Sequence, residues 1–188
     1  MKIILLISLV VFSMSNYHVP HLKLTSHSAS VKGCKQTNTH KVGERFGGGI
    51  VFYVDSTGQH GLIASEKDQK KAKWYNGNFI ITKASGTYVG AGQANTTAIV
   101  QAQGNGVYAA SVCDQLVLNG FSDWFLPSKD ELDLLRSKKG LVGGFDNLSY
   151  WSSSEYGIDY AWGQNFRSGA QDYGNKNSLP AFRAIRAF

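Results

Sequence analysis

Few residues in this chain have the type and spacing that catalysis requires. Ser152–Ser154 stand beside Glu155, but a serine nucleophile needs a base, and His60 is far away in the sequence. Asp130 and Glu131 could act as paired acids, but their position in the first turn of an expected helix explains both. The chain contains no Gly-x-Ser-x-Gly or His-Glu-x-x-His motif. We therefore expect no enzymatic activity and no catalytic residues.

Metal and cofactor sites are no better supported by the sequence. The four histidines between residues 18 and 40 lack the spacing of a helical metal site. Gly47–Gly49 precede a strand instead of joining a strand to a helix, and no Lys-Ser/Thr pair follows them, which excludes a phosphate-binding loop. We expect no metal and no cofactor.

The N-terminus has the pattern of an export signal. Met1-Lys2 is followed by the apolar run Ile3–Phe12 and by the small-x-small sequence Ser13–Ser15. A transmembrane helix needs about 20 apolar residues, so a cleaved signal peptide over residues 1–15 is favoured over an uncleaved anchor. Residues 16–40 are polar and lack periodicity, which indicates a flexible linker. The expected protein is secreted or displayed at the cell surface, without membrane insertion after signal removal.

Two cysteines leave an alternative open. Export permits a disulfide between Cys34 and Cys113. Cys113 also lies in a helical apolar pattern, which favours a small buried hydrophobic residue. Neither cysteine stands in a catalytic context.

The positive charge of the chain is concentrated in two clusters. The net charge is +6, and in an exported protein a basic patch favours acidic polysaccharides, anionic lipid headgroups or bacterial surface polymers. The alternative is that each cluster is only a solvated charged face. The candidate polyanion-binding residues are Lys67, Lys70, Lys71, Lys73, Arg136, Lys138 and Lys139.

Residues 41–188 are expected to form one α+β domain. Strands are predicted over residues 50–54, 60–64, 150–155, 160–166 and 182–188, and helices over residues 95–103, 107–118 and 129–139, with a long loop over residues 65–94. Asn95 or a neighbouring threonine would cap the first helix, Asn119-Gly120 would end the second, and Ser128 with Glu131 would form a capping box on the third. In the last strand one arginine should be buried, with Glu155 as a candidate partner.

Residues 156–177 have the composition of a binding surface. They combine rigid amphipathic aromatic residues with small polar residues that can form adaptable hydrogen bonds. Phe166 is expected in the core, whereas Trp162 could be either core or surface. The candidate ligand-binding residues are Tyr156, Asp159, Tyr160, Trp162, Asn165, Arg167, Tyr173 and Asn175.

Several motifs resemble the C-terminal domain family of the Legionella collagen-like adhesin. They are GGGIVFYVDSTGQHGL (47–62), ANTTAIV (94–100), CDQLVLNGFSDWFLPSKDELDLL (113–135), YWSSSEY (150–156) and RAIRAF (183–188). The resemblance implies a C-type-lectin-like fold, with short helices packed on small antiparallel sheets and much irregular loop. It also implies an adhesion module that binds sulfated polysaccharides and forms trimers.

The same resemblance extends to variable proteins of diversity-generating retroelements, whose variation maps to the region that is 156–177 here. The chain lacks the family's collagen-like stalk, so a homotrimer is left open, and it lacks the sugar-binding motifs of calcium-dependent lectins. We expect a non-catalytic module whose partner is an extracellular polysaccharide or, alternatively, a surface protein bound by residues 156–177, and no nucleic acid.

Overall fold

The computed structural model describes residues 39–188. The predicted signal peptide (1–15) and residues 16–38 of the predicted linker lie outside the described residues, and so does Cys34. In the described part of the chain, no helix is long and apolar enough to span a membrane.

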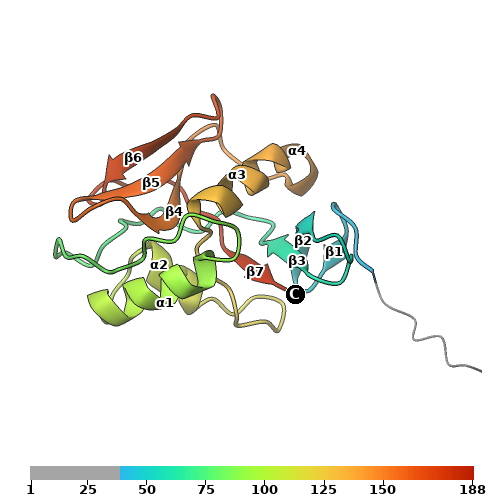
Figure 1. The fold of residues 1–188 in the computed structure, drawn as a ribbon, viewed down its shortest axis with the longest axis horizontal. Coiled ribbons are helices and arrows are strands. Elements are labelled where there is room, and N and C mark those ends of the chain that lie inside the picture. Colours follow the sequence, from blue (N-terminus) through green and yellow to red (C-terminus); the bar gives the residue numbers. More distant parts are fainter. Residues whose placement is uncertain (1–38) are drawn as a thin grey trace, which may run out of the picture. The chain divides into compact units, whose positions relative to one another are not determined.

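Two small antiparallel sheets form the framework (Figure 1). The first contains, in spatial order, β1 (Arg45–Phe46), β2 (Gly49–Val54), β3 (Gly61–Ala64) and β7 (Ile185–Ala187). The second contains β4 (Ser149–Glu155), β5 (Tyr160–Asn165) and β6 (Gln171–Asn175). The C-terminal segment contacts both sheets, because Ala181 forms a bridge with Tyr150 shortly before the chain enters β7.

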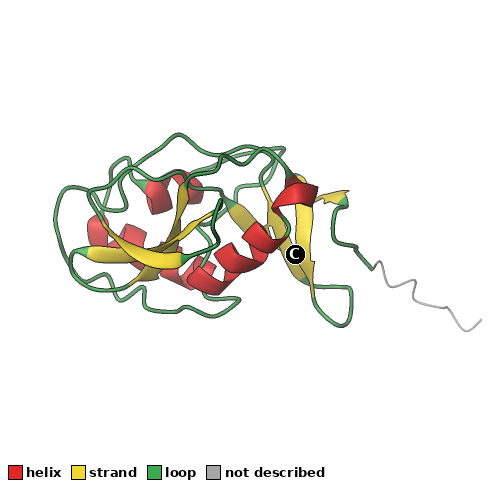
Figure 2. Ribbon diagram, turned by 90° about the horizontal axis from the view of Figure 1, so that it is seen from above, coloured by secondary structure: helices red, strands yellow, loops and turns green. Residues whose placement is uncertain are grey.

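The described residues contain four short helices. They are α1 (Gly92–Gln103), α2 (Ala109–Asp114), α3 (Lys129–Ser137) and α4 (Lys139–Val142). Figure 2 shows that long irregular segments join the helices and strands. The mixture of short helices, small antiparallel sheets and long loops confirms the predicted α+β class.

The predicted β2–β3 hairpin is confirmed, and the structure explains the glycines before it. Gly47 and Gly48 have φ values of 55° and 89° and form the tight turn between β1 and β2. A side chain at Gly49 would lie 2.2 Å from the Ala64 carbonyl oxygen. The triple glycine therefore serves backbone geometry.

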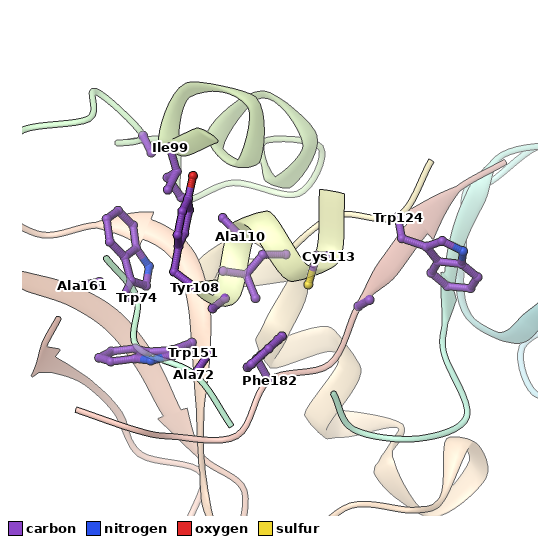
Figure 3. Packing of buried hydrophobic residues seen from close by; sticks show 14 of the residues in the cluster. Ala72, Trp74, Ile99, Tyr108, Ala110, Cys113, Trp124, Trp151, Ala161 and Phe182 are labelled. Carbon is purple, nitrogen blue, oxygen red and sulfur yellow. The ribbon is translucent and has the colours of Figure 1, made fainter. Parts of the chain in front are cut away.

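Two hydrophobic clusters form the core. One gathers Trp74, Tyr108, Trp151 and Phe182 between α1, α2 and β4 (Figure 3). The other contains Phe166, which is fully buried as predicted, and lies around β2, α3 and β4. Burial of such large side chains supplies much of the stability of a domain of this size.

Two of the predicted helices differ from those in the structure. The first begins at Gly92, three residues early, because Asn95 does not cap it but is buried, with its amide bonded to both backbone groups of Gly86. The second ends at Asp114, so the predicted apolar face is wrong at its end, where Val117 is 71% exposed.

Asn119 and Gly120 have the positive φ values that their sequence predicts, but they do not end a helix. They form a turn in which Leu118 and Phe121 exchange backbone hydrogen bonds. The Asn119 side chain also donates to the Gly48 carbonyl oxygen. Long-range contacts with the β1–β2 turn thus replace the extra turn of helix.

The strands near the C-terminus also differ from the prediction. β6 lies in a stretch for which the sequence predicts no strand, and the last strand covers only Ile185–Ala187. Arg183, just before this strand, and Arg186 within it are both buried, whereas the sequence predicts one buried arginine, and Glu155 is the partner of neither. Arg183 binds Asp68 and Arg186 binds Asp123, at 2.6 Å and 2.7 Å.

Candidate functional site: an aromatic face and a lysine loop

Four aromatic side chains from the predicted binding region meet on one face of the second sheet. Tyr160 and Trp162 are two residues apart in β5, so their side chains point to the same side of the sheet. The register pairs Trp162 with Tyr173 of β6, which places Tyr173 on that face as well. Tyr156 follows β4 and stacks on Tyr173 with ring centroids 4.2 Å apart and an interplanar angle of 6°. We call Tyr156, Tyr160, Trp162 and Tyr173 the aromatic face.

The aromatic face is open to solvent. Tyr156, Tyr160 and Tyr173 are 51%, 41% and 45% exposed, and Trp162 is half-buried. The Lys129 ammonium lies 4.9 Å from the centre of the Trp162 ring, which is a cation–π distance. Exposed tyrosines in mutual contact form a rigid, amphipathic surface suited to binding.

A buried ion pair holds the loops beside the aromatic face. Lys176 is fully buried, and its ammonium donates to Glu155 at 2.6 Å and to the carbonyl oxygens of Ile80 and Ile158. The Glu155 carboxylate also accepts hydrogen bonds from the backbone N–H groups of residues 82 and 83. The loop over residues 80–83 and the β4–β5 connection are thereby fixed to one another.

Nothing in the local sequence indicates the role of Lys176. It lies in a polar stretch, where a lysine is normally exposed, and nothing local marks it as buried. Its partner Glu155 was instead expected to bind an arginine. A predicted strand over Gln171–Asn175 would have placed Lys176 directly after an ordered strand end, and this is the one signal that could have drawn attention to it.

The other predicted ligand residues occupy different positions. Asn175 pairs with Tyr160 and lies beside the aromatic face, while Asp159 is half-buried in the β4–β5 connection. Asn165 accepts hydrogen bonds from two backbone N–H groups in the β5–β6 turn, where Arg167 is exposed. This turn is about 16 Å along β5 from Tyr160, so Asn165 and Arg167 do not belong to the aromatic face.

The first basic cluster is an exposed, well-anchored loop. Lys71 and Lys73 point outward while the alternate residues Ala72 and Trp74 are buried. Backbone hydrogen bonds from Gln69 to Phe182 and from Trp74 to Lys176 fix its course. We call Lys67, Lys70, Lys71 and Lys73, all exposed, the lysine loop.

The lysine loop keeps an uncompensated positive charge. Its two acidic neighbours, Glu66 and Asp68, are paired with Arg45 and Arg183 respectively. Among the described residues, none of the four lysines takes part in an ion pair. Four positive charges are thus available to a ligand.

The second basic cluster is partly engaged in the fold. The Lys139 ammonium donates to the Phe166 carbonyl oxygen at 2.6 Å, and Lys138 is half-buried. The Arg136 guanidinium packs so closely against the β5–β6 turn that a side chain at Gly169 would lie 2.5 Å from it. These three residues therefore offer a weaker anion site than the lysine loop.

The residues considered for catalysis have structural roles. Ser152 and Ser154 are buried and donate to the carbonyl oxygens of Trp162 and Gly86. Glu131 is buried and accepts from the backbone N–H groups of Ser128 and Gly90, and burial raises the pKa of its carboxyl. Within residues 39–188, no group of three or more His, Cys, Asp or Glu side chains gathers as a metal site.

Comparisons with known proteins agree with this architecture. The family model described as "Lcl C-terminal domain" matches residues 66–186. A fimbrial protein from Bacteroides ovatus has a similar fold, with a TM-score of 0.54 and 16% sequence identity. The match covers 73% of this chain and 43% of the fimbrial protein, so this chain spans less than half of that structure. No curated protein matches the chain.

Proposed function

The chain belongs to the Lcl C-terminal domain family, and from this membership we propose an exported, non-catalytic module of the surface or adhesion type that binds a sulfated or acidic polysaccharide. The observation that supports a polyanionic ligand is the lysine loop. Its four lysines are exposed, and the neighbouring acids are already paired. Sulfate and carboxylate groups would bind these ammonium groups through charge-assisted hydrogen bonds. The proposed location is the cell surface or the extracellular medium.

Binding of the full-length protein to heparin, titrated with salt, tests this proposal. Ligands held by several exposed ion pairs lose affinity steeply as salt is added, because exposed charges are screened over about 8 Å at physiological ionic strength. Replacing Lys70 and Lys71 by glutamine should weaken binding at least tenfold. A chelator should leave the affinity unchanged.

A matched variant controls for net charge. Lys41 and Lys83 are exposed and lie outside the lysine loop, so replacing both by glutamine should reduce heparin affinity far less. Equal losses in the two variants would show only non-specific attraction to a basic protein. No heparin binding by a folded sample would exclude the polyanion ligand.

The aromatic face favours a second function, recognition of a protein. Tyr and Trp dominate the energetics of protein interfaces, and here four of them touch one another on one exposed surface. Nearby Ile158 is 50% exposed, so the surface includes aliphatic area as well. Such a contiguous apolar patch is typical of a protein-binding site.

Substitution on the aromatic face separates the two functions. Tyr156→Ala with Tyr173→Ala should abolish capture of a protein partner and leave heparin binding intact. Protein binding would persist in high salt, because burial of apolar surface would supply most of the binding free energy. If the double variant loses heparin binding but keeps its fold, the aromatic face instead serves the polysaccharide.

A further inference from the structure

A cavity of about 320 Å³ lies under the β5–β6 hairpin, on the sheet face opposite the aromatic face. The register places Gly163 opposite both Trp151 and Asp172, and Ala161 opposite Gly174, so these residues share the inner face. Trp151 is buried and closes the inner wall, since a side chain at Gly174 would lie 3.1 Å from its indole ring. Of the residues of the aromatic face and the lysine loop, only Tyr173 also lines this cavity.

The polar groups around the cavity suit an uncharged ligand rich in hydroxyl groups. One Asp172 oxygen accepts from the Tyr173 N–H, and its second oxygen makes no hydrogen bond within the described part of the chain. The Asn165 side-chain oxygen is occupied by the turn, which leaves its amide N–H groups as donors. The Ser149 hydroxyl adds a group that can donate or accept.

Charge excludes the polyanion from this cavity. Asp172 is the one charged residue in the lining, and no Lys, Arg or His of the described chain lines it. An acidic sugar would therefore meet a carboxylate without a compensating cation. The volume is near the lower end of ligand pockets, roughly 300–1,000 Å³, which limits the occupant to about one ring.

We propose that this cavity binds a single neutral saccharide unit, held by the Asp172 carboxylate, the Asn165 amide and the Ser149 hydroxyl. None of the four lysines of the lysine loop lines this cavity. A module with both sites would recognise a neutral residue and an acidic residue separately. Two weak sites on one domain increase avidity for a heterogeneous glycan.

The test uses the full-length protein and saturation-transfer NMR with methyl glycosides of neutral hexoses and N-acetylhexosamines. At least one glycoside should bind saturably. Ala170→Leu places a larger side chain on the inner face, since Ala170 lines the cavity, and should weaken binding at least tenfold. Asp172→Asn preserves the side-chain shape and should weaken binding several-fold.

Two controls keep the result specific. Asp114→Asn removes an exposed carboxylate elsewhere and should not change glycoside affinity. The glutamine variant of the lysine loop should keep glycoside binding while losing heparin, so the two proposals can fail separately. No saturable binding at roughly 10 mM glycoside, or binding unaffected by Ala170→Leu in a folded protein, would overturn the saccharide site.

Discussion

The buried cations of residues 39–188 lie in the last thirteen positions of the chain, and each is paired with an acid. Arg183 is completely buried, binds Asp68 and donates to the carbonyl oxygens of Ser65, Gly143 and Gly144. Its guanidinium also lies 3.9 Å from the centre of the Phe145 ring. A buried charge costs several kcal/mol unless it is paired and hydrogen-bonded, so these partners are necessary for burial.

Removing the Lys176 charge should strongly destabilise the fold. Lys176→Met leaves the Glu155 carboxylate, whose side chain is 5% exposed, without its cation. The expected loss of unfolding free energy is about 3–5 kcal/mol, measured by urea denaturation. Adding Glu155→Gln to this variant should recover part of the loss, because the unpaired charge is gone.

Lys71 provides a matched control for Lys176. Lys71→Met changes an exposed lysine that forms no ion pair within residues 39–188 and should shift stability by less than about 0.5 kcal/mol. Equal effects of Lys71→Met and Lys176→Met would contradict a stabilising role of the buried pair.

Thiol labelling should find Cys113 protected. Within residues 39–188 its thiol has no disulfide partner and is fully buried, and burial raises the pKa of the thiol far above its usual range. The thiolate is the reactive form, so maleimide should label Cys113 only after denaturation. Denaturation without reductant also tests the open prediction of a disulfide, since a Cys34–Cys113 bridge would prevent labelling altogether.

At the scale of elements, α3 is the part of the fold best specified by local sequence. Ser128 accepts from the Glu131 N–H, and Glu131 accepts from the Ser128 N–H, so the predicted capping box is confirmed. The Ser128 hydroxyl also donates to the Tyr88 carbonyl oxygen at 2.8 Å. The cap therefore joins the helix start to the preceding long loop.

Ser128→Ala removes both interactions of this hydroxyl. Loss of an N-cap costs about 1 kcal/mol, and loss of the hydrogen bond to the Tyr88 carbonyl adds up to about 1 kcal/mol, so we expect a loss of about 1–2 kcal/mol in unfolding free energy. Ser137→Ala removes an exposed hydroxyl at the other end of α3 and should be nearly neutral. A near-neutral Ser128→Ala in thermal and urea unfolding would contradict this assignment.

Elements with local signals were predicted well, and elements fixed by distant partners were not. The β2–β3 hairpin, β4, β5 and α3 follow from alternation, turn residues or a cap. β6 was missed because Gln171–Asn175 lack β-branched residues and form a strand through pairing with β5. Four members of the predicted site form the aromatic face, whereas Asn165 and Arg167 were separated from it by the length of the hairpin.

At the scale of the whole molecule, ion pairs join segments that are distant in sequence. Arg183 and Asp68 are 115 positions apart, and Arg186 and Asp123 are 63 positions apart. The sequence does not reveal such pairings, since either arginine could meet any acid of the chain. They anchor the C-terminal segment to the loop after β3 and to the segment before α3.

The Asp123–Arg186 pair should make the fold sensitive to acid. Hydrogen bonds from Arg186 lower the pKa of the Asp123 carboxyl from its usual 3.8. A lowered folded-state pKa stabilises the protein above pH 3.8, and this contribution is lost as the pH falls through the folded-state value. The carboxylate is 54% exposed, so solvent screening limits the effect to less than about 1 kcal/mol. Urea unfolding between about pH 2 and pH 6 should therefore show a shallower acid dependence for Asp123→Asn than for the unmodified protein, and identical slopes would contradict a stabilising pair.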